Sequence, residues 1–127
     1  MASQGPVPQD EHARRVAATY GAAADHYDLP ALGFWDRFGA ATVSRLGLAP
    51  GHRVLDLCCG AGASALPAAR AVGPAGQVLG IDLAAPLLDL ARRGAARQGL
   101  ANIELRQGDA TSTGLARGGD PPEPSKC

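Results

Sequence analysis

The 127-residue sequence predicts an α/β fold built on a doubly wound parallel sheet, of which three strands are readable. Short apolar segments at residues 54–58, 78–82 and 103–106 have the length and composition of buried strands. Segments with helical periodicity separate these strands, and glycine or proline marks the junctions. Because strands and helices alternate in this order, we expect parallel strands joined by right-handed crossovers.

Helices are predicted ahead of the sheet, over residues 10–50, after a disordered lead at residues 1–9. Asp10 fits the cap of a first helix that runs towards Tyr20. A second helix is predicted over residues 31–46, because large side chains recur there at steps of three and four. The residues on that predicted face are Leu32, Trp35, Phe38, Thr42 and Leu46. We expect Trp35 and Phe38 to belong to the core.

The predicted sheet unit occupies residues 51–115. Its first strand, of the buried type, leads into Gly60-Ala61-Gly62 and an alanine-rich helix. The second strand ends at Asp82, and Pro86 fits the first position of a helix that Gly99 ends. The third strand is followed by a short Gly-Asp-Ala segment, and the remaining residues, 116–127, are rich in glycine and proline and predict a disordered tail.

Composition argues against several classes of partner. The formal net charge is zero and aromatic residues make up 4% of the chain, so we expect no nucleic acid partner. Neither an apolar run of about 18 residues nor a signal peptide is present, so we expect no membrane partner and a cytoplasmic location. Cys58, Cys59 and Cys127 fit neither a disulfide framework nor metal spacing, which predicts free thiols and no metal. Cys58 and Cys59 are expected to pack as small hydrophobic residues.

The strand, glycine turn and helix around Gly60 and Gly62 predict a ligand site. Glycines allow tight backbone geometry and close approach of a ligand, and the following helix presents unpaired N–H groups and a partial positive charge. Asp82 lies 22 positions after Gly60, at the end of the next strand. Because adjacent parallel strands end on the same edge of a sheet, the Asp82 carboxylate is placed to accept hydrogen bonds from a ribose diol.

Two kinds of nucleotide site fit this pattern. Gly60-x-Gly62-x-x-Ala65 matches the dinucleotide-binding fingerprint in its alanine variant. Asp56, inside the first strand, would repel a diphosphate and attract a cation, so the sequence favours a positively charged nucleoside amino acid. An NAD(P)-linked oxidoreductase fragment and a non-catalytic nucleotide-binding module stay open as alternatives. The purely structural alternatives are a turn cap for Asp56, a helix cap for Asp82 and a loop role for Asp109.

The segment Val54-Leu55-Asp56-Leu57-Cys58-Cys59-Gly60-Ala61-Gly62 resembles motif I of class I S-adenosylmethionine-dependent methyltransferases, with Cys58 where the first glycine usually stands. Gly80-Ile81-Asp82-Leu83 and Gly108-Asp109-Ala110 resemble the motifs after strands 2 and 3 of that family. Residues 20–28 are similar to the helix that covers the cofactor in methyltransferases of the ubiquinone/menaquinone-biosynthesis type. The resemblance implies a Rossmann-like fold with seven strands.

The same resemblance implies roles for individual residues. Asp56 would reach the amino group of S-adenosylmethionine, and the backbone from Cys58 through Gly60, Ala61 and Gly62 would line its methionine part. Asp82 would hold the ribose, Leu83 would pack on the adenine, and Asp109 and Ala110 would bind the adenine edge. The further candidate cofactor contacts are Tyr20 and Tyr27. No catalytic base is assigned.

The implied activity is methyl transfer to a small molecule. Because the family sheet has more strands than are readable here, we expect a truncated form that binds its cofactor weakly. The first strand would then show an apolar, unpaired edge, which a partner chain or self-association would complete.

Overall fold

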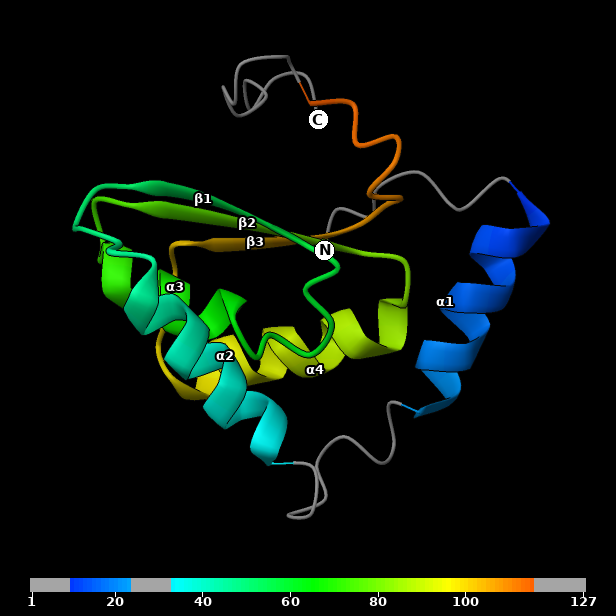
Figure 1. The fold of residues 1–127 in the computed structure, drawn as a ribbon, viewed down its shortest axis with the longest axis horizontal. Helices are drawn as coiled ribbons and strands as arrows, with labels where there is room; N and C mark the ends of the chain where they lie inside the picture. The colour runs from blue at the N-terminus through cyan, green and yellow to red at the C-terminus, as the bar shows by residue number, and fades with distance from the viewer. Residues whose placement is uncertain (1–9, 24–32, 116–127) are drawn as a thin grey trace.

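The computed structural model describes residues 10–23 and 33–115. Within them the chain forms a parallel sheet of three strands in the order β1-β2-β3, with helices before and between the strands (Figure 1). The elements are α1 (Glu11–Ala23), α2 (Phe34–Arg45), β1 (Arg53–Leu57), α3 (Ala65–Val72), β2 (Gln77–Asp82), α4 (Ala85–Arg97) and β3 (Ile103–Gln107). The predicted α/β fold with parallel strands is confirmed. The predicted disordered segments at residues 1–9 and 116–127 lie outside the described residues.

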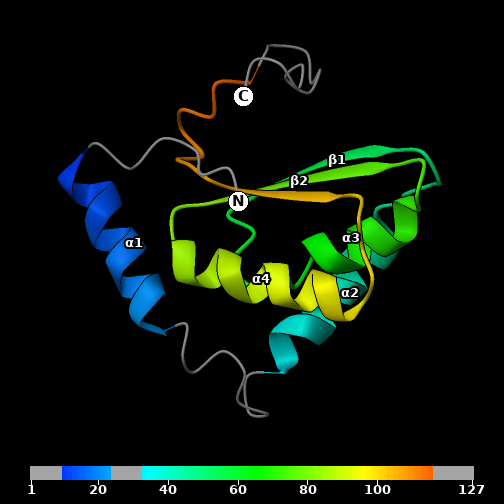
Figure 2. The ribbon, with the colours of Figure 1, turned by 180° about the vertical axis from the view of Figure 1, so that it is seen from behind.

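Helices α2, α3 and α4 lie together on one face of the sheet, and the core forms between them and the strands (Figures 1 and 2). Val78 at the start of the central strand, Val72 of α3 and Leu88 of α4 are fully buried there. Gly80 leaves room for the Cys59 side chain against the central strand, because a Cβ at position 80 would come within 2.9 Å of Cys59 Sγ. The buried cysteine is therefore a packing residue, as predicted for Cys59.

The predicted core face of α2 is wrong. Trp35, Phe38 and Leu46 are 50%, 65% and 60% exposed, whereas Gly39 and Val43 are the buried residues of this helix. Gly39 lies so close to the backbone at Ala63 and Ser64 that a side chain there would clash with it. This close approach places the small side of the helix against the sheet unit, and Trp35 and Phe38 instead contact the ring of Phe34. Leu32 lies outside the described residues.

The prediction that β1 is a buried strand is also wrong. Leu55 and Leu57 are 46% and 44% exposed, on the face of the sheet opposite the helices. In the described part of the chain, β1 pairs only with β2 and forms one edge of the sheet. The predicted apolar, unpaired edge is therefore present among these residues.

Smaller adjustments concern the ends of elements. Asp10 Oδ1 accepts a hydrogen bond of 2.6 Å from the Ala13 N–H, as expected of a helix cap. Pro86 stands at the second position of α4 rather than the first, where its missing N–H still costs nothing. Gly99, with φ of 67°, follows the helix in the left-handed region as predicted. No helix in the described ranges is both long and apolar enough to cross a membrane.

Candidate functional site

The glycine turn between β1 and α3 lies at the carboxyl edge of the sheet. The chain leaves β1 at Cys58 and turns through Gly60 and Gly62, which have φ of 55° and 93°. A Cβ on Gly62 would come within 2.9 Å of Leu66 Cγ, so this glycine is needed both for its backbone conformation and for helix packing. The predicted turn is confirmed, and the backbone from Cys58 to Gly62 forms one compact surface before α3.

Cys58 occupies the turn at a conformational cost. Its φ is 59°, and it has the only positive φ of a non-glycine residue in the described ranges. Its thiol is exposed, so the prediction that Cys58 packs as a small hydrophobic residue is wrong. Partial burial and the carboxylates of Asp82, Asp56 and Asp109 raise the pKa of this thiol. The three carboxylates therefore create a negative electrostatic potential at the Cys58 thiol.

Replacing Cys58 with glycine is expected to raise the free energy of unfolding by up to about 1 kcal/mol. The left-handed region costs a non-glycine residue about 1–2 kcal/mol, and the greater entropy of glycine in the unfolded chain offsets part of the gain. Urea unfolding of the two proteins measures the difference. Cys58→Ala is the control, because it removes the thiol and keeps the strained backbone; an equal gain in both variants would contradict the explanation.

Asp82 ties the ends of two strands together. Its Oδ2 accepts a hydrogen bond of 2.9 Å from the Gly60 N–H, and its Oδ1 accepts one of 2.9 Å from the Ala84 N–H. Asp82 is not the cap residue of α4, which is Ala84; its carboxylate instead holds the N–H of that cap residue. Each carboxylate oxygen has a second lone pair, so both oxygens can still accept a ligand hydroxyl. Asp82, not Asp56, is the acid that caps the glycine turn.

Asp56 has a buried carboxylate oxygen without a partner at this edge. Its Oδ2 is the only buried side-chain polar atom without a hydrogen-bond partner in the described ranges. Burial raises the pKa of Asp56, and the Asp82 carboxylate adds to the rise, while a hydrogen bond with the Ser64 side chain opposes it. An unsatisfied acceptor of this kind is costly unless a donor or a cation completes it. Ser64 near Asp56 was not predicted; it stands directly before α3, where its side chain makes no cap hydrogen bond to the helix.

The third acid has a more local role. Asp109 Oδ1 accepts hydrogen bonds from Thr111, 2.8 Å from its N and 2.6 Å from its Oγ1. These bonds, and the positive charge of His12 in α1, lower the pKa of Asp109. Asp109 therefore stabilises a turn, as the structural alternative proposed. The position of His12 near this acid was not predicted.

Most of the predicted cofactor-binding residues lie at the carboxyl edge of the sheet, and the others lie elsewhere. Leu83 directly follows β2, and Ala61 and Ala110 lie in the segments after β1 and β3; all three residues are half-buried. Helix α1 lies beside the start of α4, where Gly21 faces Pro86 (Figure 2). Tyr20 of this helix is 50% exposed. Tyr27 lies outside the described residues. No group of three His, Cys, Asp or Glu side chains within the described ranges is arranged to hold a metal ion.

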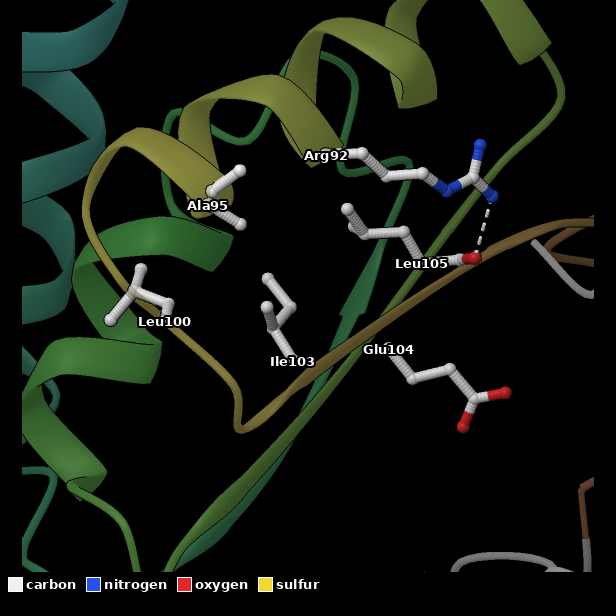
Figure 3. A pocket seen from close by; sticks show the side chains of 7 residues that line it. Arg92, Ala95, Leu100, Ile103, Glu104 and Leu105 are labelled. Carbon is white, nitrogen blue, oxygen red and sulfur yellow. Dashed lines mark hydrogen bonds between the residues drawn. The ribbon is translucent and has the colours of Figure 1, made fainter. Parts of the chain in front are cut away.

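A cavity of about 450 Å³ lies elsewhere, between α4 and β3 (Figure 3). Leu100 and Ile103 line it near the amino end of β3, away from the glycine turn. Arg92, at its rim, is turned to the backbone of Leu105. The residues that line this cavity include none of the acids of the carboxyl edge, so it is separate from the glycine turn.

Together, the parallel strands, the glycine turn and the acids at consecutive strand ends have the arrangement that is typical of nucleotide-binding α/β folds. A sequence profile of the methyltransferase domain family matches residues 54–119. The chain therefore belongs to the methyltransferase domain family, and its fold is part of the Rossmann-like fold of S-adenosylmethionine-dependent methyltransferases.

Individual relatives agree with this assignment. Aklanonic acid methyltransferase DauC from Streptomyces sp. (strain C5) is 36% identical over 109 residues, covering 86% of this chain and 50% of that protein. The ubiquinone/menaquinone biosynthesis C-methyltransferase UbiE from Cellvibrio japonicus is 37% identical over 112 residues, covering 82% and 44%. A SAM-dependent methyltransferase from Aquifex aeolicus aligns in its crystal structure with a TM-score of 0.57 and 25% identity, covering 70% and 47%. The chain thus spans about half the length of the curated relatives it matches.

Proposed function

We propose that the carboxyl edge of this sheet binds S-adenosylmethionine. The observation that carries the proposal is Asp56, whose Oδ2 is buried without a partner among the described residues. A carboxylate oxygen of this kind fits the ammonium group of the cofactor, and the negative potential around Cys58 fits its sulfonium. A diphosphate would add negative charge to a site that already holds three carboxylates.

The remaining residues fit the same ligand. We assign the methionine part to the backbone of Gly60, Ala61 and Gly62, and the ribose hydroxyls to Asp82, whose oxygens are fixed by two backbone N–H groups. Leu83 would lie against the adenine ring. The adenine edge would meet Asp109 and the Ala110 N–H. Tyr20 and Tyr27 belong to the proposed cover over the cofactor, together with the helices of residues 10–50.

We propose methyl transfer to a small molecule as the activity that this domain serves. When bound, the cofactor supplies a methyl group on a positively charged sulfur. The chain's own residues hold that group in place and exclude water from it, and orientation of this kind accounts for much of the rate in a direct displacement. Support for a small-molecule substrate comes from the relatives, which are named for aklanonic acid and for quinone biosynthesis. The cytoplasm remains the proposed location.

We expect this chain alone to bind the cofactor weakly and to show little turnover. The β1 strand that carries Asp56 is an edge strand with half-exposed leucines in the described region, so the site has support on one side only. Weak support of a binding residue reduces affinity because ordering it costs free energy on binding.

The test is calorimetric titration of the purified chain with S-adenosylhomocysteine and, separately, with NADH. We expect heat of binding with S-adenosylhomocysteine and none with NADH, because a diphosphate is repelled by the acids of the site. Preferential binding of NADH would overturn the proposal in favour of an oxidoreductase fragment. Methyl transfer from labelled cofactor would exclude a non-catalytic binding module.

A further inference from the structure

A side chain from β3 holds the loop that joins β2 to α4 (Figure 2). Gln107, the last residue of β3, donates a hydrogen bond of 3.0 Å from its Nε2 to the carbonyl oxygen of Leu83. The next N–H along the chain, that of Ala84, donates to Asp82 Oδ1 at 2.9 Å. Because the Leu83 carbonyl and the Ala84 N–H belong to one planar peptide group, side chains from two strands hold that group at both ends.

The hydrogen bonds continue from this peptide group to the glycine turn. Asp82 Oδ2 accepts the Gly60 N–H at 2.9 Å, so a single carboxylate links the loop before α4 with the turn after β1. Hydrogen bonds in such a chain polarise one another inside a protein, and the loss of one member weakens its neighbours. Gln107 is the donor at the β3 end of this chain.

Helix α4 provides no side-chain cap for the same peptide group. Its cap residue is Ala84, whose side chain has no atom that can accept an N–H. The direction of the peptide group between Leu83 and Ala84 therefore depends on Asp82 and Gln107. A rotation of this group would move the two residues that the proposed function assigns to the adenine and the ribose.

The pairing of β2 with β3 does not depend on the Gln107 side chain. The strands place Asp82 beside Gln107, and the Gly108 N–H donates to the main-chain oxygen of Asp82 at 3.0 Å. These bonds join main-chain groups, which remain when the side chain of Gln107 is changed. The contribution of the Gln107 amide is therefore the bond to the loop.

We propose that Gln107 is a positioning residue of the cofactor site, which directs the Asp82 carboxylate towards the ribose through the peptide group between Leu83 and Ala84. The inference rests on the proposed function, because it concerns the same site. Gln107 itself makes no contact with the ligand in this arrangement. It lowers the free energy cost of ordering Leu83 and Asp82 when the adenosine half binds.

Replacing Gln107 with methionine tests the proposal, because methionine has a similar length but donates no hydrogen bond. The ligand is 5′-methylthioadenosine, which contains the adenine and the ribose but no amino acid. Calorimetry with the full chain is expected to show an affinity about three- to tenfold below that of wild type, since one neutral hydrogen bond is lost. Gln107→Glu should weaken binding as well, because an ionised carboxylate cannot donate to the Leu83 carbonyl.

A second ligand separates positioning from a purely structural role. In 5′-methylthio-2′-deoxyadenosine one of the hydroxyls proposed to bind Asp82 is missing, so Gln107→Met should weaken this ligand by a smaller factor. A general loosening of the domain would weaken both ligands by the same factor. The matched control is Gln98→Met, which removes an amide that accepts a hydrogen bond from Arg70 outside the site. It should leave both affinities unchanged.

Hydrogen exchange without ligand tests the inference separately from the proposed function. In Gln107→Met the Ala84 amide is expected to exchange about three- to tenfold faster than in wild type, while the Gly108 amide in the sheet keeps its rate. An unchanged rate at Ala84, or equal weakening of the two ligands, would overturn the inference and leave the cofactor proposal intact. If wild type binds neither ligand, the proposed function fails and this inference fails with it.

Discussion

Replacing Asp82 with alanine is expected to lower the affinity for S-adenosylhomocysteine by about 100-fold or more. Two hydrogen bonds from ribose hydroxyls to a carboxylate contribute about 1.5–3 kcal/mol each. The same carboxylate holds the Gly60 and Ala84 N–H groups, so its loss also loosens the glycine turn that lines the methionine part. Isothermal titration calorimetry of wild type and variant measures the change directly.

The control for charge is Asp89→Ala, which removes one exposed carboxylate of α4 that lies in no part of the proposed site. It should leave the affinity unchanged. A second ligand, 5′-methylthioadenosine, separates the halves of the site because it contains the ribose but lacks the amino acid. Asp82→Ala should weaken both ligands. If the variant binds both as tightly as wild type does, Asp82 is only a structural residue.

The features that were predicted correctly depend on residue types within a few positions of the chain. The three strands, the glycine turn and the acid at the end of β2 follow from apolar runs and turn residues that act over a few positions. The close placement of Asp56 and Asp82 follows as well, because parallel neighbours end at the same edge. These are short-range consequences of residue type, and they position the site.

The failures concern contacts between distant segments. Periodicity predicted that Trp35 and Phe38 lie in the core. The helix instead packs through Gly39, because any side chain at this position would clash with the backbone of Ala63 and Ser64. An apolar segment predicted a buried strand, yet Leu55 is half exposed, because its burial depends on what covers that face of the sheet. The effect of Ser64 on the pKa of Asp56 likewise depends on how α3 begins relative to β1. No periodic pattern carries that information.

Replacing Asp56 with asparagine is expected to have opposite effects on the stability of the ligand-free protein and on cofactor binding. Burial raises the pKa of Asp56 above its ordinary value of 3.8, so the ionised carboxylate is less stable in the folded chain than in the unfolded one. The wild-type free energy of unfolding therefore falls as pH rises from the ordinary pKa through the raised one. Asp56→Asn does not titrate, so urea unfolding at neutral pH should show a gain in stability that disappears in acid.

The same substitution removes the charge that the cofactor ammonium needs. We expect the affinity for S-adenosylhomocysteine to fall about tenfold or more, since a charge-assisted hydrogen bond is lost, while 5′-methylthioadenosine binds unchanged. Wild-type affinity should also rise with pH across the titration of Asp56, because the cation binds the ionised form. A stabilised variant with undiminished affinity for both ligands would assign Asp56 a purely structural role. If the variant loses affinity only for S-adenosylhomocysteine, Asp56 binds the amino group of the ligand. The buried carboxylate would then lower the stability of the ligand-free domain and gain its missing partner when the cofactor binds.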